Sequence, residues 1–207
     1  MSDKTLLMIF IKNPVKGKVK TRLAKTIGEE KALSVYLQLL THTCKETIQT
    51  EGVKKVFYSD KIEEKDLWDS AYFGKCVQEG NDLGERMYNA FRLGFAEGFT
   101  KIVIIGSDCP ELSSDIIATA FSKLIENDFV IGPATDGGYY LLGMKKLAKE
   151  IFENKTWSTA TVLQDTIDDL DKMKSSYYLL PVLSDVDEEK DLEFLYQSEK
   201  TGFIRPF

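Results

Sequence analysis

The sequence predicts an α/β protein built on a mostly parallel, doubly wound sheet, and two observations support this fold class. Short apolar, β-prone runs alternate along the chain with segments of helical periodicity, as expected when helices connect parallel strands. Residues 102–105 of the segment KIVIIGSDCP form an uninterrupted apolar run, which is typical of a central strand buried on both faces. We therefore expect a three-layer α/β/α arrangement.

The first strand is predicted at residues 5–11 (TLLMIFI), which are apolar and β-prone. The loop KNPVKGKVKTRL follows, with Pro14 and Gly17 as its turn residues. Apolar side chains then recur at helical spacing over residues 34–50, and this pattern predicts the first helix.

The middle of the chain is predicted to contribute two strands and two helices before the central strand. A strand at residues 53–58 is followed by a helix at 61–72 and a short strand at 76–78. Asp82 is expected to cap the next helix, which runs to about Gly98, because aspartate is a favoured N-cap residue.

The segment after the central strand is expected to make the sheet mixed. Ser113 or Ser114 caps a helix that ends at Asn127, and a further strand begins at residues 129–131. The run YYLLG (139–143) follows closely enough to pair with that strand in the antiparallel direction.

Two glycines and three elements complete the predicted fold. Gly137 and Gly138 lie between two β-prone runs and predict a tight turn or a close backbone approach. The remaining elements are a helix at residues 160–173, a strand at 177–183 and a terminal helix at 188–198.

Length and composition predict one domain, residues 1–207, since no repeat, low-complexity segment or linker divides the chain. No apolar run approaches the roughly 20 residues that span a bilayer, and the amino terminus lacks a small-residue cleavage site. Cys44, Cys76 and Cys109 form no CxxC pair, which indicates a reducing compartment and no zinc site. We expect a cytoplasmic protein without a membrane span.

Charge is distributed unevenly along the chain. Residues 1–25 contain seven lysines and arginines and one aspartate, so they carry a net charge of +6, whereas the remaining 182 residues carry −12. A confined basic site on an acidic body suits a small anionic ligand, whereas a nucleic acid requires a broad basic face. An ordinary solvated charge run is the alternative.

The basic segment resembles neither of two familiar nucleotide-binding fingerprints. No GxxxxGK[ST] is present, and no GxGxxG follows the first strand. Instead, a loop at the carboxyl end of that strand offers cations and backbone N–H groups that could cradle a diphosphate. Arg22 suits bidentate phosphate contact, and Lys20 would act as a point charge. The expected substrate-binding residues of this loop are Lys12, Pro14, Gly17, Lys20, Thr21 and Arg22.

Asp108 follows the central strand and is therefore expected at the carboxyl edge of the sheet, where open α/β sheets bind their ligands. A carboxylate at this edge can hold a divalent cation against a substrate diphosphate. The alternative interpretation is that Asp108 only caps the helix that follows it.

Six segments together carry a resemblance to a known superfamily. They are KNPVKGKVKTRL (12–23), QEGNDLGERM (78–87), GSDCP (106–110), GPATDGGYYLLG (132–143), TWSTATV (156–162) and DVDEEKDL (185–192). In this order they resemble the GT-A-type nucleotide-diphospho-sugar transferase superfamily, and most closely a small bacterial and archaeal group labelled glycosyltransferase. The resemblance implies a Rossmann-like GT-A fold, a nucleotide-sugar donor, a small-molecule acceptor, and Mg²⁺ or Mn²⁺ as cofactor.

The resemblance places Asp108 in the position of the superfamily's metal-binding aspartate, although GSDCP lacks the doubled D-x-D of many glycosyltransferases. The second carboxylate is expected from DVDEEKDL, which resembles a D-x-D-T-x-E-D-L segment of related nucleotidyltransferases, with Glu188 in place of the threonine. Asp187 is the preferred partner of Asp108, and Asp185 is the reserve. Capping of a helix at Glu188 is the alternative for both.

The resemblance also places the turn ATDGGY on the acceptor or sugar side. Asp136 could bind sugar hydroxyls or serve as the catalytic base, since a carboxylate within reach of the acceptor can take its proton. The alternative is that Asp136 completes a turn with Gly137 and Gly138. Tyr139 would line the same surface.

Two further motifs each allow a ligand-binding and a structural interpretation. Trp157 and Ser158 could offer a stacking face and a hydroxyl near the sugar, whereas a core tryptophan is the competing interpretation. Asp82, Glu85 and Arg86 are interpreted first as a helix cap with first-turn charges, and second as nucleotide contacts.

Three functions compete at this point. The preferred one is a metal-dependent glycosyltransferase, in which metal and basic loop stabilise the departing diphosphate while an acceptor hydroxyl attacks the anomeric carbon. The first alternative is nucleotidyl transfer from a nucleoside triphosphate to a phosphorylated substrate, because the amino-terminal loop also resembles that of phospholactate guanylyltransferases. The second is a catalytically silent nucleotide-binding domain, which the missing D-x-D and the altered Glu188 would support.

Overall fold

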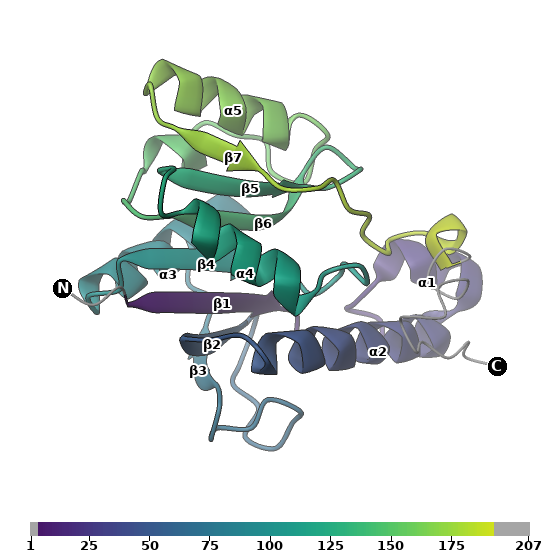
Figure 1. Ribbon diagram of the computed structural model, residues 1–207. Helices are drawn as coiled ribbons and strands as arrows, with labels where there is room; N and C mark the ends of the chain where they lie inside the picture. The colour runs from purple at the N-terminus through teal and green to yellow at the C-terminus, as the bar shows by residue number, and fades with distance from the viewer. Residues whose placement is uncertain (1–3, 193–207) are drawn as a thin grey trace.

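The computed structural model of this chain describes residues 4–192, and within them seven strands form one sheet. The strands are β1 (Thr5–Ile11), β2 (Val53–Tyr58), β3 (Gly74–Val77), β4 (Lys101–Ile105), β5 (Phe129–Pro133), β6 (Tyr139–Met144) and β7 (Tyr177–Leu179). Their order is β3-β2-β1-β4-β6-β5-β7, and β6 alone runs antiparallel to its neighbours in this described part (Figure 1). The predicted mostly parallel, mixed sheet is confirmed.

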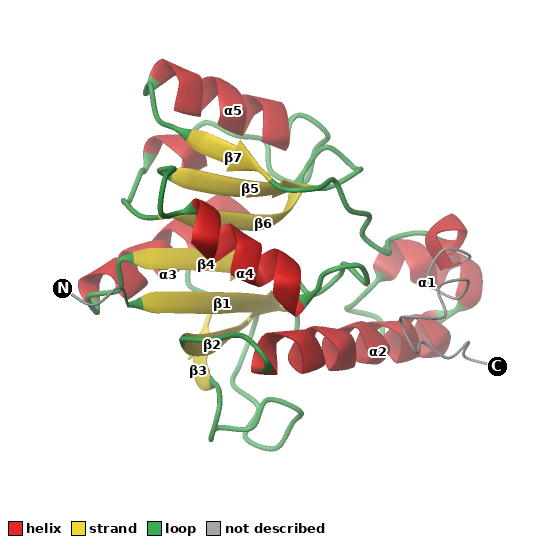
Figure 2. Ribbon diagram, viewed as in Figure 1, coloured by secondary structure: helices red, strands yellow, loops and turns green. Residues whose placement is uncertain are grey.

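Helices cover both faces of this sheet (Figure 2). The helical elements are α1 (Thr21–Ile27), α2 (Glu29–Ile48), α3 (Leu83–Ala96), α4 (Ser114–Lys123), the 3-10 helix η1 (Glu150–Phe152) and α5 (Val162–Lys172). One face packs against α2 and α4, and the other against α3, η1 and α5, which confirms the three-layer arrangement. Within residues 4–192, no helix has both the length and the apolar character needed to cross a membrane.

Alternation of side chains along β1 builds a separate core on each face of the sheet. Leu7 and Ile9 are fully buried in the cluster that Tyr36 of α2 joins. Leu6 and Met8 are fully buried on the opposite face, in the cluster of Phe91 from α3. Because both faces are covered, the strand is apolar throughout, and this is why its bounds could be predicted from the sequence.

The hairpin between β5 and β6 inserts the antiparallel strand. Gly137 in its turn has φ of 87°, in the left-handed region that favours glycine. A β-carbon on Gly137 would also collide with the carbonyl oxygen of Ala160. The tight turn and the close backbone approach predicted for the Gly-Gly pair therefore both occur here.

The prediction of a helix at residues 61–72 is wrong, because this segment forms a loop between β2 and β3. The Asp66 carboxylate accepts hydrogen bonds from the Tyr58 hydroxyl, from Lys75 Nζ at 2.7 Å and from the Trp68 N–H at 3.0 Å. Trp68 itself is buried, with 1% of its surface exposed. These tertiary contacts override a helix propensity that is worth only tenths of a kcal/mol per residue, roughly 0–0.7.

Several helix boundaries also differ from the prediction. Helix α4 ends at Lys123 instead of Asn127, and α5 spans Val162–Lys172 instead of 160–173. Helix α1 begins at Thr21, inside the segment expected to be a loop, and α2 begins at Glu29 instead of residue 34. Gly28, with φ of 87°, separates the two helices. The 3-10 helix η1 was not predicted.

Three other elements were predicted with different bounds. Strand β3 begins at Gly74 instead of residue 76, and β7 ends at Leu179 instead of residue 183. Leu183 makes only an isolated bridge to Ala134. The terminal helix predicted at 188–198 begins at residue 189, and its part beyond residue 192 lies outside the described residues.

We predict that Gly137→Ala lowers the free energy of unfolding by more than the control Gly98→Ala. Gly98 has φ of 86° but no atom within 4 Å of an added β-carbon, so its substitution should cost only the strained φ, about 1–2 kcal/mol. Gly137→Ala should cost about 1–3 kcal/mol more, because the backbone at Ala160 must shift. Urea denaturation of both variants measures the difference, and equal losses would contradict the close approach.

Candidate active site

The carboxyl ends of β1 and β4 bring three distant segments of the chain together. The loop after β1 leads to Lys20, the turn after β4 carries Asp108, and the segment that contains Val186 lies against both. The Val186 N–H donates a hydrogen bond of 3.0 Å to the carbonyl oxygen of Asp108, and the Val186 side chain is buried beside Leu23 of α1. Asp185 and Asp187 are thereby held close to Asp108, as the family resemblance implied.

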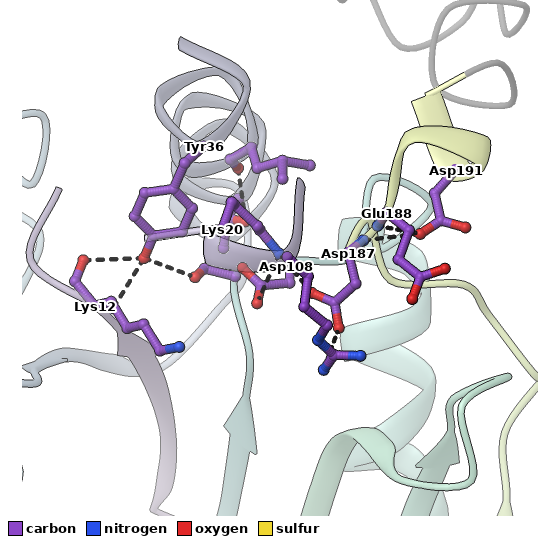
Figure 3. Close-up of polar contacts among 11 residues, drawn as sticks. Lys12, Lys20, Tyr36, Asp108, Asp187, Glu188 and Asp191 are labelled. Carbon is purple, nitrogen blue, oxygen red and sulfur yellow. Dashed lines mark hydrogen bonds and ion pairs between the residues drawn. The ribbon is translucent and has the colours of Figure 1, made fainter. Parts of the chain in front are cut away.

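The centre of this arrangement is the ammonium group of Lys20 (Figure 3). Lys20 Nζ lies 2.9 Å from Asp108 Oδ2 and 3.3 Å from Asp187 Oδ1. Arg22 Nη2 lies 3.1 Å from Asp187 Oδ2. The Lys20 side chain is only 3% exposed, whereas that of Arg22 is 62% exposed. We call the four residues Lys20, Arg22, Asp108 and Asp187 the ionic centre.

Lys20 is charged and conformationally unusual. Burial acts to lower the pKa of its ammonium group, but the charges of Asp108 and Asp187 outweigh burial and leave that pKa raised. Its backbone has φ of 47° and ψ of 45°, a left-handed conformation that costs a non-glycine residue roughly 1–2 kcal/mol. Such strain persists only where surrounding contacts fix it, and it is concentrated at functional sites.

Asp185 is buried beside the ionic centre, and the pKa of its carboxyl group is raised. Burial is the largest cause that raises the pKa of Asp185 to about 7, and the charge of Asp108 raises it further. Lys20 lowers this pKa, but its effect is smaller, and Asp136 and Asp187 add to the increase. The charges of Asp108, Asp187 and Lys20 therefore all act on Asp185 at this edge of the sheet.

Helix capping does not account for Asp108 or Asp187. Helix α4 is capped by Ser113, whose hydroxyl accepts the Ile116 N–H at 3.3 Å. Near Asp187 the capping contacts are made by Asp191, whose Oδ2 accepts the N–H groups of Asp187 at 2.9 Å and of Glu188 at 2.7 Å. Both aspartates in question instead face Lys20 (Figure 3).

The donor set fits a divalent cation of the Mg²⁺ or Mn²⁺ type, since these ions prefer carboxylate oxygens. Asp108 and Asp187 each direct one such oxygen at the Lys20 ammonium, and Asp185 lies near enough for their charges to act on it. Across residues 4–192, however, no three acidic, histidine or cysteine side chains converge as they would around one bound ion. In this structure the Asp108 and Asp187 carboxylates converge on Lys20 instead.

A small cleft of about 160 Å³ opens at the ionic centre. Its lining residues are Lys12, Val19, Lys20, Thr21, Arg22, Tyr36, Asp108 and Asp187. The volume is below the roughly 300–1,000 Å³ of pockets that enclose a whole small molecule. The cleft therefore suits the charged end of a ligand, such as a phosphate group, more than an entire nucleotide.

Tyr36 is a functional candidate that sequence reasoning missed. Its hydroxyl accepts the Lys12 N–H at 2.8 Å, donates to the Lys12 carbonyl at 2.9 Å and lies 3.4 Å from Ser107 Oγ. It therefore joins the start of the basic loop to the turn that carries Asp108. In the sequence Tyr36 falls on the apolar face of α2, where it cannot be distinguished from a core residue.

The other predicted residues of the basic loop divide into two groups. Lys12 and Thr21 line the cleft. Pro14 is half-buried and Gly17 has φ of 76°, so they shape the turn, but neither lines the cleft. Their predicted substrate contact is not supported by this geometry.

The hairpin turn places Asp136 at the same edge of the sheet, although the turn residues do not line the cleft. Asp136 Oδ1 accepts the Gly138 N–H at 2.9 Å, so the carboxylate does complete the turn, as the alternative interpretation expected. Its charge nevertheless acts on Asp185. Tyr139 packs into the core, and its buried hydroxyl has no hydrogen-bond partner among the described residues.

Trp157 and Ser158 lie away from the ionic centre. The Trp157 ring fills the space above Gly84 of α3 and stacks on Phe152, with 6.5 Å between ring centroids. It lines a different, larger cleft of about 600 Å³ that shares no lining residue with the cleft at Lys20. Ser158 is exposed and has φ of 63°. The core interpretation of Trp157 therefore describes its packing better than a stacking face does.

Comparison with known proteins gives one family and several structures. Residues 43–159 match the model of a family described as "Uncharacterized protein conserved in bacteria (DUF2064)". No curated protein matches the chain. A crystal structure of a candidate nucleotide-diphospho-sugar transferase from Desulfovibrio desulfuricans G20 is 30% identical, with 97% of this chain and 89% of that chain covered and a TM-score of 0.88.

Two more distant structures share the fold. A cytidylyltransferase from Leptospira borgpetersenii serovar Hardjo-bovis is 13% identical, with 100% of this chain and 90% of that chain covered and a TM-score of 0.62. Rv0371c of Mycobacterium tuberculosis H37Rv, in complex with manganese, is 12% identical, with 95% and 100% covered and a TM-score of 0.57. At these identities the likeness concerns the fold alone.

We predict that Tyr36→Phe weakens binding of nucleoside diphosphates by about tenfold, equivalent to roughly 1.4 kcal/mol. The variant keeps the buried ring but leaves the Lys12 peptide groups without their partner, so the loop is no longer held. The control is Tyr58→Phe, which also removes a buried hydroxyl but one bound to Asp66. Calorimetric titration measures affinity, and denaturant melts measure stability. Equal affinity in both variants would remove Tyr36 from the site.

Proposed function

We propose that this chain, which belongs to the family described as "Uncharacterized protein conserved in bacteria (DUF2064)", is a transferase that uses a nucleotide substrate. The Desulfovibrio relative supports this coarse assignment, because it is 30% identical over 97% of this chain and is itself described as a candidate nucleotide-diphospho-sugar transferase. Within that class we propose a glycosyltransferase that depends on Mg²⁺ or Mn²⁺, with a nucleoside-diphosphate sugar as donor and a small molecule as acceptor.

The observation that carries the proposal is the ionic centre at the carboxyl edge of the sheet. It places a buried ammonium, an exposed guanidinium and aspartate carboxylates around one small cleft. Cations are required to bind a diphosphate, and carboxylates are required to hold a divalent ion against it. The same cleft therefore contains both kinds of group that transfer from a nucleoside-diphosphate sugar needs.

Each residue has a role in this proposal. Arg22 binds diphosphate oxygens with its fork of N–H donors, and Lys12 and Lys20 add point charges. Asp108 and Asp187 hold the divalent ion, with Asp185 in reserve. When bound, that ion supplies charge neutralisation of the departing diphosphate.

The proposed transfer forms one bond and breaks one. The acceptor oxygen bonds to the anomeric carbon, the bond from that carbon to the diphosphate oxygen breaks, and the electron pair leaves with the diphosphate. The acceptor proton passes to the Asp136 carboxylate, which is exposed at the hairpin turn. Lys20 and Arg22 stabilise the negative charge that develops on the leaving group.

Nucleotidyl transfer is the second candidate, and the fold similarity to a cytidylyltransferase is the observation that favours it. In that reaction a phosphorylated substrate attacks the α-phosphate of a nucleoside triphosphate, and pyrophosphate leaves. The same cations and carboxylates would serve both reactions, so the donor distinguishes them.

A thermal-shift panel followed by product assays tests the proposal. Nucleoside diphosphates, triphosphates and nucleotide sugars are each added with and without manganese. A ligand at 100 times its dissociation constant raises stability by about 2.7 kcal/mol. We expect the largest metal-dependent shift with a nucleotide sugar, followed by release of nucleoside diphosphate in the presence of acceptor. Release of pyrophosphate from a triphosphate would instead establish nucleotidyl transfer.

We predict that Asp108→Asn folds but loses turnover by about a hundredfold or more, equivalent to roughly 2.7 kcal/mol. Asparagine keeps the shape and can still accept a hydrogen bond from Lys20, but it lacks the charge that Mg²⁺ or Mn²⁺ requires. The free energy of unfolding should fall by about 1–3 kcal/mol, because a buried ammonium loses one of its two anionic partners.

The control for this prediction is Asp115→Asn, which removes the same charge from an exposed position in the first turn of α4. It should leave turnover unchanged. Nucleotide-sugar binding is titrated with and without manganese in both variants. Metal-dependent binding that persists in Asp108→Asn would remove Asp108 from the metal site and leave Asp185 and Asp187 to hold the ion.

A further inference from the structure

The Lys20 ammonium occupies the position at which the proposed function needs a metal ion. It contacts one oxygen of Asp108 at 2.9 Å and one oxygen of Asp187 at 3.3 Å, and its side chain is 3% exposed. We propose that Lys20 is an internal counter-ion that competes with the divalent cation, so that the metal binds tightly only together with the nucleotide diphosphate. This inference rests on the proposed function and adds that Lys20 regulates metal binding at the same site.

A counter-ion is needed because the carboxylates stand close together. Asp108 and Asp187 are joined through one nitrogen atom, and Asp185 lies near enough for their charges to act on it. Without a cation between them, like charges in a partly buried site repel one another. Lys20 supplies that cation from within the chain, and Arg22 supplies a second one at Asp187.

Lys20 cannot remain in place when a metal ion binds to the same oxygens. Mg²⁺ sits at roughly 2.0–2.1 Å from its oxygen ligands, so it would lie inside the space that the ammonium fills. Two cations at the same carboxylates would also repel each other. The ammonium must therefore leave Asp108 Oδ2 and Asp187 Oδ1 before these two oxygens can hold the metal.

A diphosphate in the cleft gives the displaced ammonium a new anionic partner. Lysine carries its charge on a flexible four-carbon stem with three rotatable donors, which suits a change of partner. The backbone of Lys20 is held by the hydrogen bond that its carbonyl accepts from the Ala24 N–H at 2.8 Å, so the side chain alone needs to turn. Because the diphosphate draws Lys20 away from the carboxylates, each ligand should strengthen binding of the other.

The test is a titration of Mn²⁺ into protein without nucleotide, with free Mn²⁺ measured by electron paramagnetic resonance. The proteins are wild type, Lys20→Met and the control Lys25→Met. Lys25 is exposed on α1, the helix that Lys20 precedes as its N-cap residue, and its substitution changes the net charge by the same amount. We expect Lys20→Met to bind Mn²⁺ at least about tenfold more tightly than the other two proteins, although it has lost a predicted phosphate contact.

The wild-type titration is repeated with each common nucleoside diphosphate (ADP, GDP, CDP and UDP), after correction for Mn²⁺ bound by the nucleotide alone. At least one diphosphate should tighten Mn²⁺ binding to wild type and to Lys25→Met, and it should tighten binding to Lys20→Met much less. A change of that kind is coupling between two ligands and does not follow from a purely structural role of Lys20.

A measurement on wild type alone covers the case in which Lys20→Met does not fold. Reductive methylation followed by mass spectrometry reports whether each lysine amine is accessible. Lys20 should resist methylation in the free protein, because it is buried and paired, and it should become reactive at saturating Mn²⁺. Protection that persists while Mn²⁺ is bound would overturn the proposal.

The remaining outcomes separate this inference from the proposed function. Equal or weaker Mn²⁺ binding by Lys20→Met, together with loss of Mn²⁺ binding in Asp108→Asn, would overturn the counter-ion and leave the metal-dependent transferase standing. If none of the proteins binds Mn²⁺, with or without a diphosphate, both the metal dependence and the counter-ion are wrong.

Discussion

The buried ammonium of Lys20 is the constraint on which the candidate site depends. Two unit charges about 3 Å apart attract by roughly 5 kcal/mol at an effective dielectric constant of about 20, whereas taking an ion out of water costs several kcal/mol. A 3%-exposed lysine is therefore tolerated only with close anionic partners, and Asp108 and Asp187 provide them. Pairing with these partners fixes the basic loop, the turn after β4 and the 185–187 segment relative to one another.

The sheet makes this convergence possible. Strands β1 and β4 are parallel neighbours, so the basic loop and Asp108 leave the sheet at the same edge. Residues beyond β7 return to that edge, where Val186 bonds to the backbone of Asp108 and packs against α1 (Figure 1). The site thus joins the first and last parts of the described chain, and its geometry should be sensitive to contacts at either end.

Much of the fold could be predicted because buried strands are apolar over their whole length. The bounds of β1, which is buried along nearly its whole length, agree with the predicted 5–11. Those of β2 agree with 53–58, although only its second half is buried. The prediction of a helix at 61–72 failed because a single carboxylate, Asp66, organises the loop through contacts to Tyr58 of β2 and Lys75 of β3. Sequence periodicity contains no information on such contacts. The single domain over residues 1–207 stays a prediction.

The candidate site could be predicted from the sequence less completely than the fold. The family resemblance anticipated that Asp108 and the 185–187 segment would meet, which spacing alone could not show. That Lys20 faces these carboxylates was not anticipated, because a basic residue beside a predicted phosphate site is expected to face the phosphate. Its left-handed backbone and its burial depend on tertiary packing. Tyr36 was missed for the related reason that one hydroxyl on an apolar helix face leaves no periodic signal.

The most direct measurement of the central claim is an anomalous difference map from crystals soaked with Mn²⁺ and a nucleoside diphosphate. If the ionic centre binds metal and phosphate, a manganese peak should lie within about 2.2 Å of oxygens from Asp108 and Asp187. The Lys20 ammonium should then contact a phosphate oxygen. A manganese peak elsewhere in the molecule, or a diphosphate bound while Lys20 stays between the two carboxylates, would contradict it.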